Sequence, residues 1–366
     1  MKAAILVETN KPLEIHNIEL ESLKEGEVLI KMVAAGVCHS DHHAMVGHFP
    51  TRTPIILGHE GAGIIEEVGP NVKSLKKGDH VVSVWRYSCG TCEPCMSGSP
   101  ATCGEGARMR ADGTLSDGTT RFKLKNEKIH HFLGVSTFSS YSIASEKSVM
   151  KIRKDMPLEK AALVSCGVIT GFGAVKNAAK VQPGESVAVF GTGGVGLNAI
   201  QGASIMGAEP VIAVDLLQNK LEYAKKFGAT HTINSSDENA EERILEITNG
   251  LGVHYAFEMI GVPEVMSTAF NSLRTGGTVV VSGLAQFESK VSIPSVPLVL
   301  QEKKLMGSLY GSTNPRLEVP RLIDLYLAGK LNLDDLLTRS YPIEEINEAY
   351  DALIKGEVAR SIIKHH

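Results

Sequence analysis

A glycine-rich loop between a strand-like run and a helix-like run constrains the fold of this chain more than any other stretch. The run SVAVF precedes the loop GTGGVG, which extends from Gly191 to Gly196. Apolar residues at helical spacing follow the loop, and a second strand-like run then ends at Asp215. Similar alternation continues through residues 255–259 and 278–283. Strands that alternate with helices predict a doubly wound parallel sheet, so we expect an α/β fold in this region.

The same loop indicates a dinucleotide site. Its first glycine permits the tight turn, and the next ones let the backbone approach a pyrophosphate that the amides at the helix start would bind. Asp215 lies 19 residues past Gly196, where its carboxylate could accept hydrogen bonds from an adenosine ribose and would repel a 2′-phosphate. We therefore expect NAD rather than NADP, and the alternative is a glycine turn that binds no ligand. The predicted coenzyme-loop residues are Gly191, Gly193, Gly194, Val195 and Gly196.

A second constraint is a segment, residues 86–121, in which cysteine, glycine and proline replace apolar periodicity. Cys89, Cys92, Cys95 and Cys103 follow the pattern C-x2-C-x2-C-x7-C. Four thiolates at this spacing can enclose one ion tetrahedrally and leave no open position. We predict a structural zinc site in this lobe, with a disulfide pair or an iron–sulfur cluster as the alternatives.

Length and composition bound the remaining choices. With 366 residues the chain is expected to form two domains at roughly 100 to 200 residues each. A net charge of -4 argues against nucleic acid or an anionic membrane as a partner. The N-terminal run has no signal-peptide pattern, and we expect no apolar stretch that approaches the ~18 residues of a membrane span. We expect a cytoplasmic protein, in which cysteines bind metal more often than they form disulfides.

The segment GVCHSDHHAMVGHFPTRTPIILGHEGAG, residues 36–63, gathers further metal-binding side chains. Cys38 offers a thiolate and His59 an imidazole, which both suit zinc. When the four cysteines of the lobe are set aside, Cys166 is the remaining one. Two thiolates and one imidazole would make a neutral zinc site with an open fourth position, as a catalytic metal requires.

These motifs together resemble the zinc-dependent medium-chain alcohol dehydrogenases over essentially the whole chain. GVCHSD, GHE, the cysteine lobe, SCGVITGFGA and GTGGVG occur in the order typical of that family. The resemblance implies a GroES-like, β-rich catalytic domain formed by residues 1–168 and 311–366, with the structural zinc lobe at 86–121. It implies a Rossmann domain for NAD at residues 169–310.

The resemblance also implies an activity and an assembly. The activity is reversible hydride transfer between NAD and a primary alcohol or aldehyde of medium-chain or aromatic type. It would use two zinc ions per chain, one catalytic and one structural. The long form of the segment between the lobe and Cys166 favours a homodimer, with a tetramer as the alternative.

Roles near the catalytic zinc follow from the resemblance position by position. Ser40 is the expected first acceptor of the alcohol proton, and His43 the last station of a relay to solvent. Asp41 is expected to orient the imidazole of His59. Glu60 matches an acid that lies behind the zinc and can assist ligand exchange.

Contacts with coenzyme and substrate are implied in the same way. Trp85 is expected on one wall of the substrate pocket, with Phe132 and Leu133 opposite. The pyrophosphate would lie near two basic side chains, the nicotinamide near a threonine and the adenosine ribose near a lysine. These coenzyme residues are His39, Arg360, Thr170 and Lys220.

Three alternatives remain open. The tail GSLYGSTNPRLEVPRLIDLY is similar to bacterial relatives that use a dye acceptor or a small thiol, so a nicotinoprotein with permanently bound NADH is one alternative. A thiol-dependent formaldehyde dehydrogenase is another, although Ala107 stands where that class has an anchoring arginine. The third is a zinc-free structural relative that binds nucleotides without catalysis, against which the seven intact ligands argue.

Overall fold

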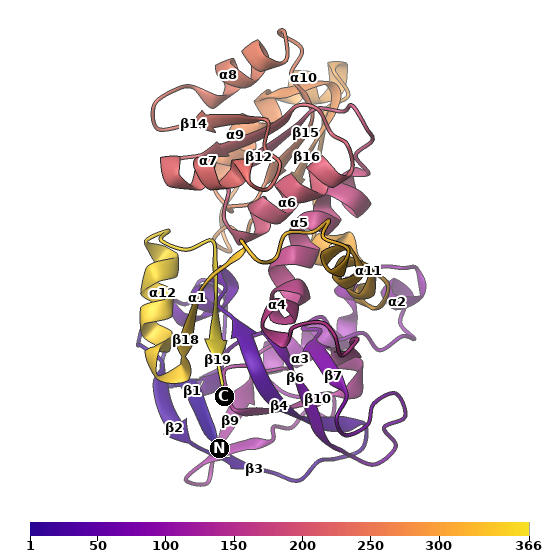
Figure 1. Ribbon diagram of the computed structural model, residues 1–366, viewed down its shortest axis with the longest axis vertical. Coiled ribbons are helices and arrows are strands. Elements are labelled where there is room, and N and C mark those ends of the chain that lie inside the picture. The colour runs from indigo at the N-terminus through magenta and orange to yellow at the C-terminus, as the bar shows by residue number, and fades with distance from the viewer. Residues whose placement is uncertain (366) are drawn as a thin grey trace. The chain divides into compact units, whose positions relative to one another are not determined.

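The computed structural model describes residues 1–365, which form two compact units (Figure 1). Unit 1 comprises Met1–Cys166, Asn314–Gly329 and Leu333–His366, and unit 2 comprises Gly167–Thr313 and Lys330–Asn332. The division after Cys166 lies two residues before the predicted boundary, and the return at Asn314 lies three residues after it. The short return of the chain to unit 2 at 330–332 was not predicted.

Unit 1 is built on two β-sheets. The first has six strands in the order β2-β1-β5-β9-β8-β3. They are β1 (Lys2–Leu6), β2 (Glu14–Asn17), β3 (Glu19–Leu20), β5 (Ile55–Ile56), β8 (Phe122–Leu124) and β9 (Glu127–His131). The second has seven strands, six in the order β11-β7-β6-β4-β19-β18, with β10 paired to β4. They are β4 (Glu27–Gly36), β6 (Glu60–Val68), β7 (His80–Ser83), β10 (Tyr141–Ser145), β11 (Val149–Lys151), β18 (Leu337–Pro342) and β19 (Arg360–Lys364).

Strand β4 is the centre of the second sheet, because β6, β10 and β19 all pair with it. Val28, Ile30 and Met32 alternate along it and are buried in one core cluster, as expected for a strand with a side-chain period of two. Its last residue, Gly36, pairs with Glu60 of β6 and with Ile362 of β19. The carboxyl end of the chain is therefore placed beside the GHE motif.

Six α-helices accompany these sheets: α1 (His39–Met45), α2 (Glu93–Met96), α3 (Gly104–Asp112), α4 (Leu158–Leu163), α11 (Pro315–Leu327) and α12 (Ile346–Ile354). Helix α11 begins where Asn314 caps the amide of Arg316. Helix α12 has one apolar face, since Ile346, Ala349 and Tyr350 are buried in one cluster with residues of β1 and β4.

Unit 2 is a six-stranded sheet in the order β14-β13-β12-β15-β16-β17, in which every pair is parallel. Its strands are β12 (Val187–Phe190), β13 (Val211–Asp215), β14 (His231–Asn234), β15 (Val253–Glu258), β16 (Leu273–Val281) and β17 (Lys304–Gly307). Its helices are α5 (Ile169–Gly173), α6 (Gly194–Ile205), α7 (Gln218–Lys225), α8 (Ala240–Ile247), α9 (Pro263–Asn271) and α10 (Ser295–Leu300). The chain starts at β12 and builds outward in both directions, which confirms the doubly wound sheet (Figure 1).

The run Leu158–Ala179 corrects one expectation. It forms 22 residues of continuous helix with a mean hydropathy of 1.4, long and apolar enough by composition to cross a membrane. However, 78% of its most apolar window is buried inside the protein. The apolar character of this helix is therefore explained by packing within the fold.

Candidate active site and metal centres

Four buried side chains converge in unit 1. One ligand atom from each of Cys38, His59, Glu60 and Cys166 lies within 4.8 Å of the others. Cys38 ends the connection between β4 and α1, and His59 directly precedes β6. Cys166 lies in a π-helical turn, Val164–Val168, a type of irregularity that is frequent at functional sites.

The spacing of these donors fits one metal ion. His59 Nε2 lies 3.3 Å from Cys166 Sγ. Ligand bonds of ~2.0 Å from nitrogen and ~2.3 Å from sulfur, at a tetrahedral angle, separate the two atoms by about 3.5 Å. All four side chains are almost fully withdrawn from solvent, so charge on the thiolates needs a cation close by. The predicted set Cys38, His59 and Cys166 is thus brought together.

Asp41 fixes the orientation of the histidine. Its Oδ1 accepts hydrogen bonds from the amide of Gly58 and from Nδ1 of His59, both at 3.0 Å. With its proton on Nδ1, the imidazole presents Nε2 to the metal position. Gly58 has φ +86°, and a Cβ there would lie 2.7 Å from the amide nitrogen of Phe138, so this turn requires glycine.

Glu60 lies on the same side as the donors and forms an ion pair with Arg360. Glu60 Oε2 accepts from Arg360 Nη2, and both side chains are buried. Burial raises the pKa of Glu60 to about 7, although the guanidinium of Arg360 opposes that shift. The other oxygen, Oε1, lies 4.0 Å from His59 Nε2 and has no hydrogen-bond partner in the described chain. Arg360 is therefore a neighbour of the metal centre, and its predicted contact with the pyrophosphate stays a prediction.

Ser40 and His43 lie in α1, close in sequence to the metal donors. The ring of His43 contacts His48 edge-on, with centroids 5.2 Å apart, and Phe49 at 5.3 Å. Burial lowers the pKa of His43, and His48 and His42 lower it further, so the ring is neutral near pH 7 and able to accept a proton. Among the described residues no hydrogen bond joins Ser40 to His43, so the relay between them remains a prediction.

Two of the three predicted pocket residues contact the metal-binding histidine. Trp85 meets the ring of His59 edge-on, with centroids 5.5 Å apart, and Phe132 does so at 6.1 Å. Leu133 follows Phe132 with φ +53° and packs, partly buried, against the β-sheet cores. The aromatic rings of Trp85 and Phe132 therefore lie beside the candidate metal position.

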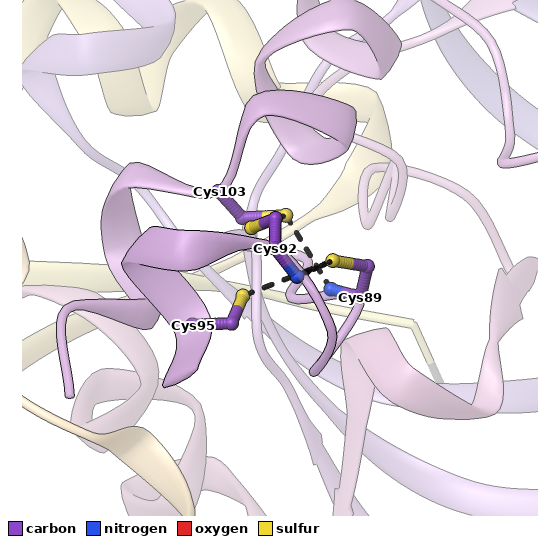
Figure 2. Close-up of side chains that lie close together, drawn as sticks. All are labelled: Cys89, Cys92, Cys95 and Cys103. Carbon is purple, nitrogen blue, oxygen red and sulfur yellow. Dashed lines mark hydrogen bonds between the residues drawn. The ribbon is translucent and has the colours of Figure 1, made fainter. Parts of the chain in front are cut away.

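The four-cysteine lobe is a second candidate metal centre, and Figure 2 shows its sulfur atoms directed toward one another. Sγ of Cys89 lies 4.0 Å from that of Cys95, and Sγ of Cys92 lies 3.9 Å from that of Cys103. A regular tetrahedron with ~2.3 Å bonds has edges of about 3.8 Å, so the cluster fits a single ion. All six cysteines are free, which contradicts the disulfide alternative.

Backbone amides support the thiolates of this lobe. Thr91 and Cys92 donate amide hydrogen bonds to Sγ of Cys89, at 3.4 and 3.3 Å. These bonds, that of Thr91 first, lower the pKa of Cys89 to about 6. A thiolate is the form that binds a metal, so the local backbone favours the ligand state.

The coenzyme loop lies in unit 2, between β12 and α6. A Cβ at Gly196 would lie 1.8 Å from the carbonyl oxygen of Gly191, so the close approach of loop and helix requires glycine. Asp215 ends β13, and its Oδ2 accepts hydrogen bonds from the amide and the hydroxyl of Thr192 at 2.8 and 2.9 Å. Asp215 is thus hydrogen-bonded to the glycine loop at the carboxyl edge of the sheet.

The other predicted coenzyme residues are distributed over both units. Thr170 lies in α5 and Lys220 in α7, both in unit 2 and both partly buried. His39 is the exposed first residue of α1 in unit 1. Their contacts with a coenzyme remain predictions.

Known families match both units. Residues 24–154 match the alcohol dehydrogenase GroES-like domain, and residues 194–328 match zinc-binding dehydrogenases. The chain belongs to the zinc-dependent alcohol dehydrogenase family. This dehydrogenase is 44% identical over 367 residues to the NDMA-dependent alcohol dehydrogenase of Amycolatopsis methanolica, covering 100% of this chain and 98% of that protein.

Two further relatives agree with this assignment. The dehydrogenase is 41% identical to a class-3 alcohol dehydrogenase of Dictyostelium discoideum, over 99% of this chain and 97% of that protein. The crystal structure of benzyl alcohol dehydrogenase from Acinetobacter calcoaceticus has a TM-score of 0.95 and 37% identity, covering 100% of this chain and 99% of that one. These matches confirm the predicted family and fold class, and they identify an oxidoreductase of the alcohol dehydrogenase type.

Sequence reasoning missed several residues of this dehydrogenase that lie at its candidate sites. The guanidinium of Arg86 lies 4.5 Å above the Trp85 ring, and His48 contacts His43. Glu258 ends β15 beside the coenzyme loop, where its Oε1 accepts amide hydrogen bonds from Ile260, Gly261 and Val262. An acid directly after a buried strand was the available signal for Glu258.

Proposed function

We propose that this dehydrogenase transfers a hydride reversibly between NAD and a primary alcohol of medium-chain or aromatic type. The observation that carries the proposal is the buried donor set of Cys38, His59 and Cys166, with aromatic rings edge-on to the histidine. Apolar walls beside a metal position favour a substrate with an apolar body and one oxygen. The similarity to a benzyl alcohol dehydrogenase supports the aromatic case.

The chain's own residues prepare the site for alcohol oxidation. A zinc ion held by the three donors would supply Lewis-acid polarisation of the alcohol oxygen, which lowers the pKa of the alcohol. Asp41 holds His59 in the tautomer that presents Nε2 to the metal. Ser40 would take the alcohol proton, and the neutral ring of His43 would accept it on the way to solvent.

The choice of NAD rests on Asp215. Its carboxylate is held beside the glycine loop by Thr192, at the place where an adenosine ribose is bound in this type of fold. A carboxylate there accepts hydrogen bonds from the ribose hydroxyls, and its charge disfavours a 2′-phosphate. We therefore propose NAD as the coenzyme.

A substrate panel tests this function. The zinc-loaded protein is assayed with ethanol, octanol and benzyl alcohol, each with NAD and with NADP, by absorbance of the reduced coenzyme. We expect turnover of octanol or benzyl alcohol with NAD and little with NADP. A protein with two zinc ions that reduces neither coenzyme with any of these alcohols would contradict the proposal. Formaldehyde with and without glutathione, in the same assay, tests the thiol-dependent alternative.

A second candidate is a nicotinoprotein in which NADH stays bound and an external acceptor reoxidises it. The 44% identity to an NDMA-dependent alcohol dehydrogenase favours this variant. The near-UV absorbance of the protein as purified distinguishes the two, because permanently bound NADH absorbs there and exchangeable coenzyme is removed. Turnover that needs NDMA and no added NAD would support the second candidate.

Replacing Ser40 with alanine should reduce alcohol oxidation at neutral pH by about 100-fold, because a positioned proton acceptor contributes roughly that much. Ser40 is not a metal donor, so the zinc content should remain two per chain. The variant is compared with Ser289→Ala, which removes an exposed hydroxyl of unit 2 and should have no effect. Wild-type rates in Ser40→Ala would show that the relay assignment is wrong.

We propose a second copy of this chain as the partner of unit 2. Every residue of the edge strand β17 is exposed, and α10 has no buried residue. Val299 and Leu300 in α10 are 71% and 78% exposed, an unusual position for two apolar side chains. If the β17 strands of two copies paired across a twofold axis, the sheet edge at β17 and the apolar face of α10 would be covered in both copies.

The mass in solution tests this assembly. We expect about twice the 39.2 kDa chain mass by sedimentation, and a shift toward the single-chain mass in Leu300→Glu. Met96→Glu, which changes an exposed apolar residue in α2, is the matched control and should stay dimeric. A wild-type protein that sediments as a single chain would contradict the proposal, and a mass of four chains would support the tetramer alternative.

A further inference from the structure

A tyrosine beside the catalytic metal centre has no role in the mechanism described so far. Tyr350 lies in α12, is 2% exposed, and its hydroxyl has no hydrogen-bond partner within residues 1–365. Leaving a buried hydroxyl unsatisfied costs about 1 to 3 kcal/mol. We therefore expect a hydrogen-bond acceptor close to the Tyr350 hydroxyl.

Asp41 has a buried carboxylate oxygen that lacks a hydrogen-bond donor among the described residues. Its Oδ1 is engaged by Gly58 and His59, whereas Oδ2 is buried with no hydrogen-bond partner in the part of the chain that the structure describes. An ionised carboxylate is an acceptor only, and a tyrosine hydroxyl can donate. The two orphaned atoms are therefore chemically matched.

Packing places Tyr350 against the face of α1 that carries Asp41, because Ala44, three residues after Asp41 on the same face, is buried in one core cluster with Tyr350. The ring of His42, which follows Asp41, stacks over Tyr350 with centroids 6.4 Å apart and planes 28° apart. The ring of Phe138 also meets the Tyr350 ring, edge-on, with centroids 6.2 Å apart. Burial, and then the charge of Asp41 ahead of every other charged neighbour, keep the pKa of the Tyr350 hydroxyl well above its usual value. The hydroxyl therefore retains its proton and can donate a hydrogen bond.

We propose that the Tyr350 hydroxyl is hydrogen-bonded to Oδ2 of Asp41 through one bridging water molecule, because neither atom has a partner within the described chain. With both oxygens engaged, the carboxylate of Asp41 is fixed in its plane, and the imidazole of His59 is fixed through Oδ1. Tyr350 is thus a positioning residue that acts on the catalytic metal through Asp41 and His59. The proposal rests on the metal centre of the proposed function, and not on the choice of alcohol or coenzyme.

Zinc release tests this role without any assay of turnover. Tyr350→Phe keeps the ring that packs between His42 and Phe138 and removes only the donor. In the zinc-loaded protein with excess chelator, we expect one of the two zinc ions to leave about tenfold faster, the lower end of the ~10- to 100-fold cost of losing an outer-sphere partner. The ion of the four-cysteine lobe should leave at the wild-type rate and serves as an internal control.

Tyr341→Phe is the matched control. Tyr341 is also buried in unit 1, and its hydroxyl accepts from Arg339 at 3.0 Å, so the substitution removes a hydroxyl engaged elsewhere. We expect no change in release of either ion. Equal, wild-type release rates in Tyr350→Phe would overturn the proposal, and so would faster release of both ions, which indicates general loosening.

A double substitution separates positioning from packing. In an Asp41→Asn background, adding Tyr350→Phe should change zinc release by less than about twofold, because the pathway through Asp41 is already broken. Independent, multiplicative effects of the two substitutions would overturn the proposal. If Asp41→Asn does not fold, the visible spectrum of cobalt-substituted Tyr350→Phe replaces it, and an unshifted spectrum counts against positioning of His59. Each readout is independent of alcohol oxidation, so failure of the proposed reaction would be distinguishable.

Discussion

Replacing Cys38 with alanine should leave one zinc ion per chain in place of two and reduce alcohol oxidation by more than about 100-fold. Loss of an outer partner of a metal ligand already costs ~10- to 100-fold, and loss of a ligand costs more. Cys38 is 6% exposed and adjoins β4, so alanine removes a sulfur atom with little change of backbone. Metal analysis after gel filtration, together with the alcohol panel, measures both effects.

The matched control is Val37→Ala, which shortens a fully buried neighbour and leaves every donor in place. We expect it to lower stability by about 1 to 3 kcal/mol, as large-to-small core changes do, while it retains two zinc ions and most activity. If Cys38→Ala also kept two zinc ions, the donor set of the catalytic centre would be wrong.

Local sequence patterns predicted the elements that carry the site. The glycine loop before α6 and the acid at the end of β13 are each visible in a short window, because strand and helix periods act over a few residues. Cys38 and His59 were predictable as ligands because their motif lies within one 28-residue segment. The four cysteines of the lobe were predictable for the same reason.

Contacts between distant segments could not be predicted in this way. Glu60 and Arg360 are 300 residues apart and meet only because β19 pairs with β4, which itself pairs with β6. Tyr350 lies in one core cluster with Ala44 of α1 because of the packing of α12, and the sequence shows only that Tyr350 belongs to an apolar face. The partner of a buried polar group depends on tertiary packing, which a single sequence does not reveal.

The composition of the helix from Leu158 to Ala179 is also explained by tertiary packing, which the sequence alone does not reveal. Small residues and glycines interrupt its apolar residues, so its hydropathy over a membrane-spanning length was missed. Gly171 explains part of the composition, because a Cβ there would lie 2.1 Å from the carbonyl oxygen of Val195 in α6. Close helix contact selects small residues, and the resulting pattern resembles neither a membrane span nor a surface helix.

The last expected result concerns the lobe, residues 86–121. Replacing Cys103 with serine should remove one zinc ion, lower Tm by about 10 °C, and make this segment susceptible to limited proteolysis. The core of the lobe consists of Tyr87, Cys103 and Met109 with the other cysteines packed against them, so apolar burial alone is too small to hold it. Zinc supplies ~10 to 16 kcal/mol in zinc-finger peptides, and losing even a few of these in a domain of this size shifts Tm by ~2 to 4 °C per kcal/mol.

Ser88→Ala is the control for this variant, because it changes a neighbouring side chain that is not a donor. It should keep two zinc ions and the wild-type Tm. A colourless purified protein with two zinc ions would also exclude an iron–sulfur cluster, whose thiolate-bound irons absorb visible light. If Cys103→Ser kept both ions and the wild-type Tm, the metal could not be what holds the lobe together. The catalytic zinc should survive in Cys103→Ser, because its donors lie next to β4 and β6 and in the π-helical turn Val164–Val168, outside the lobe.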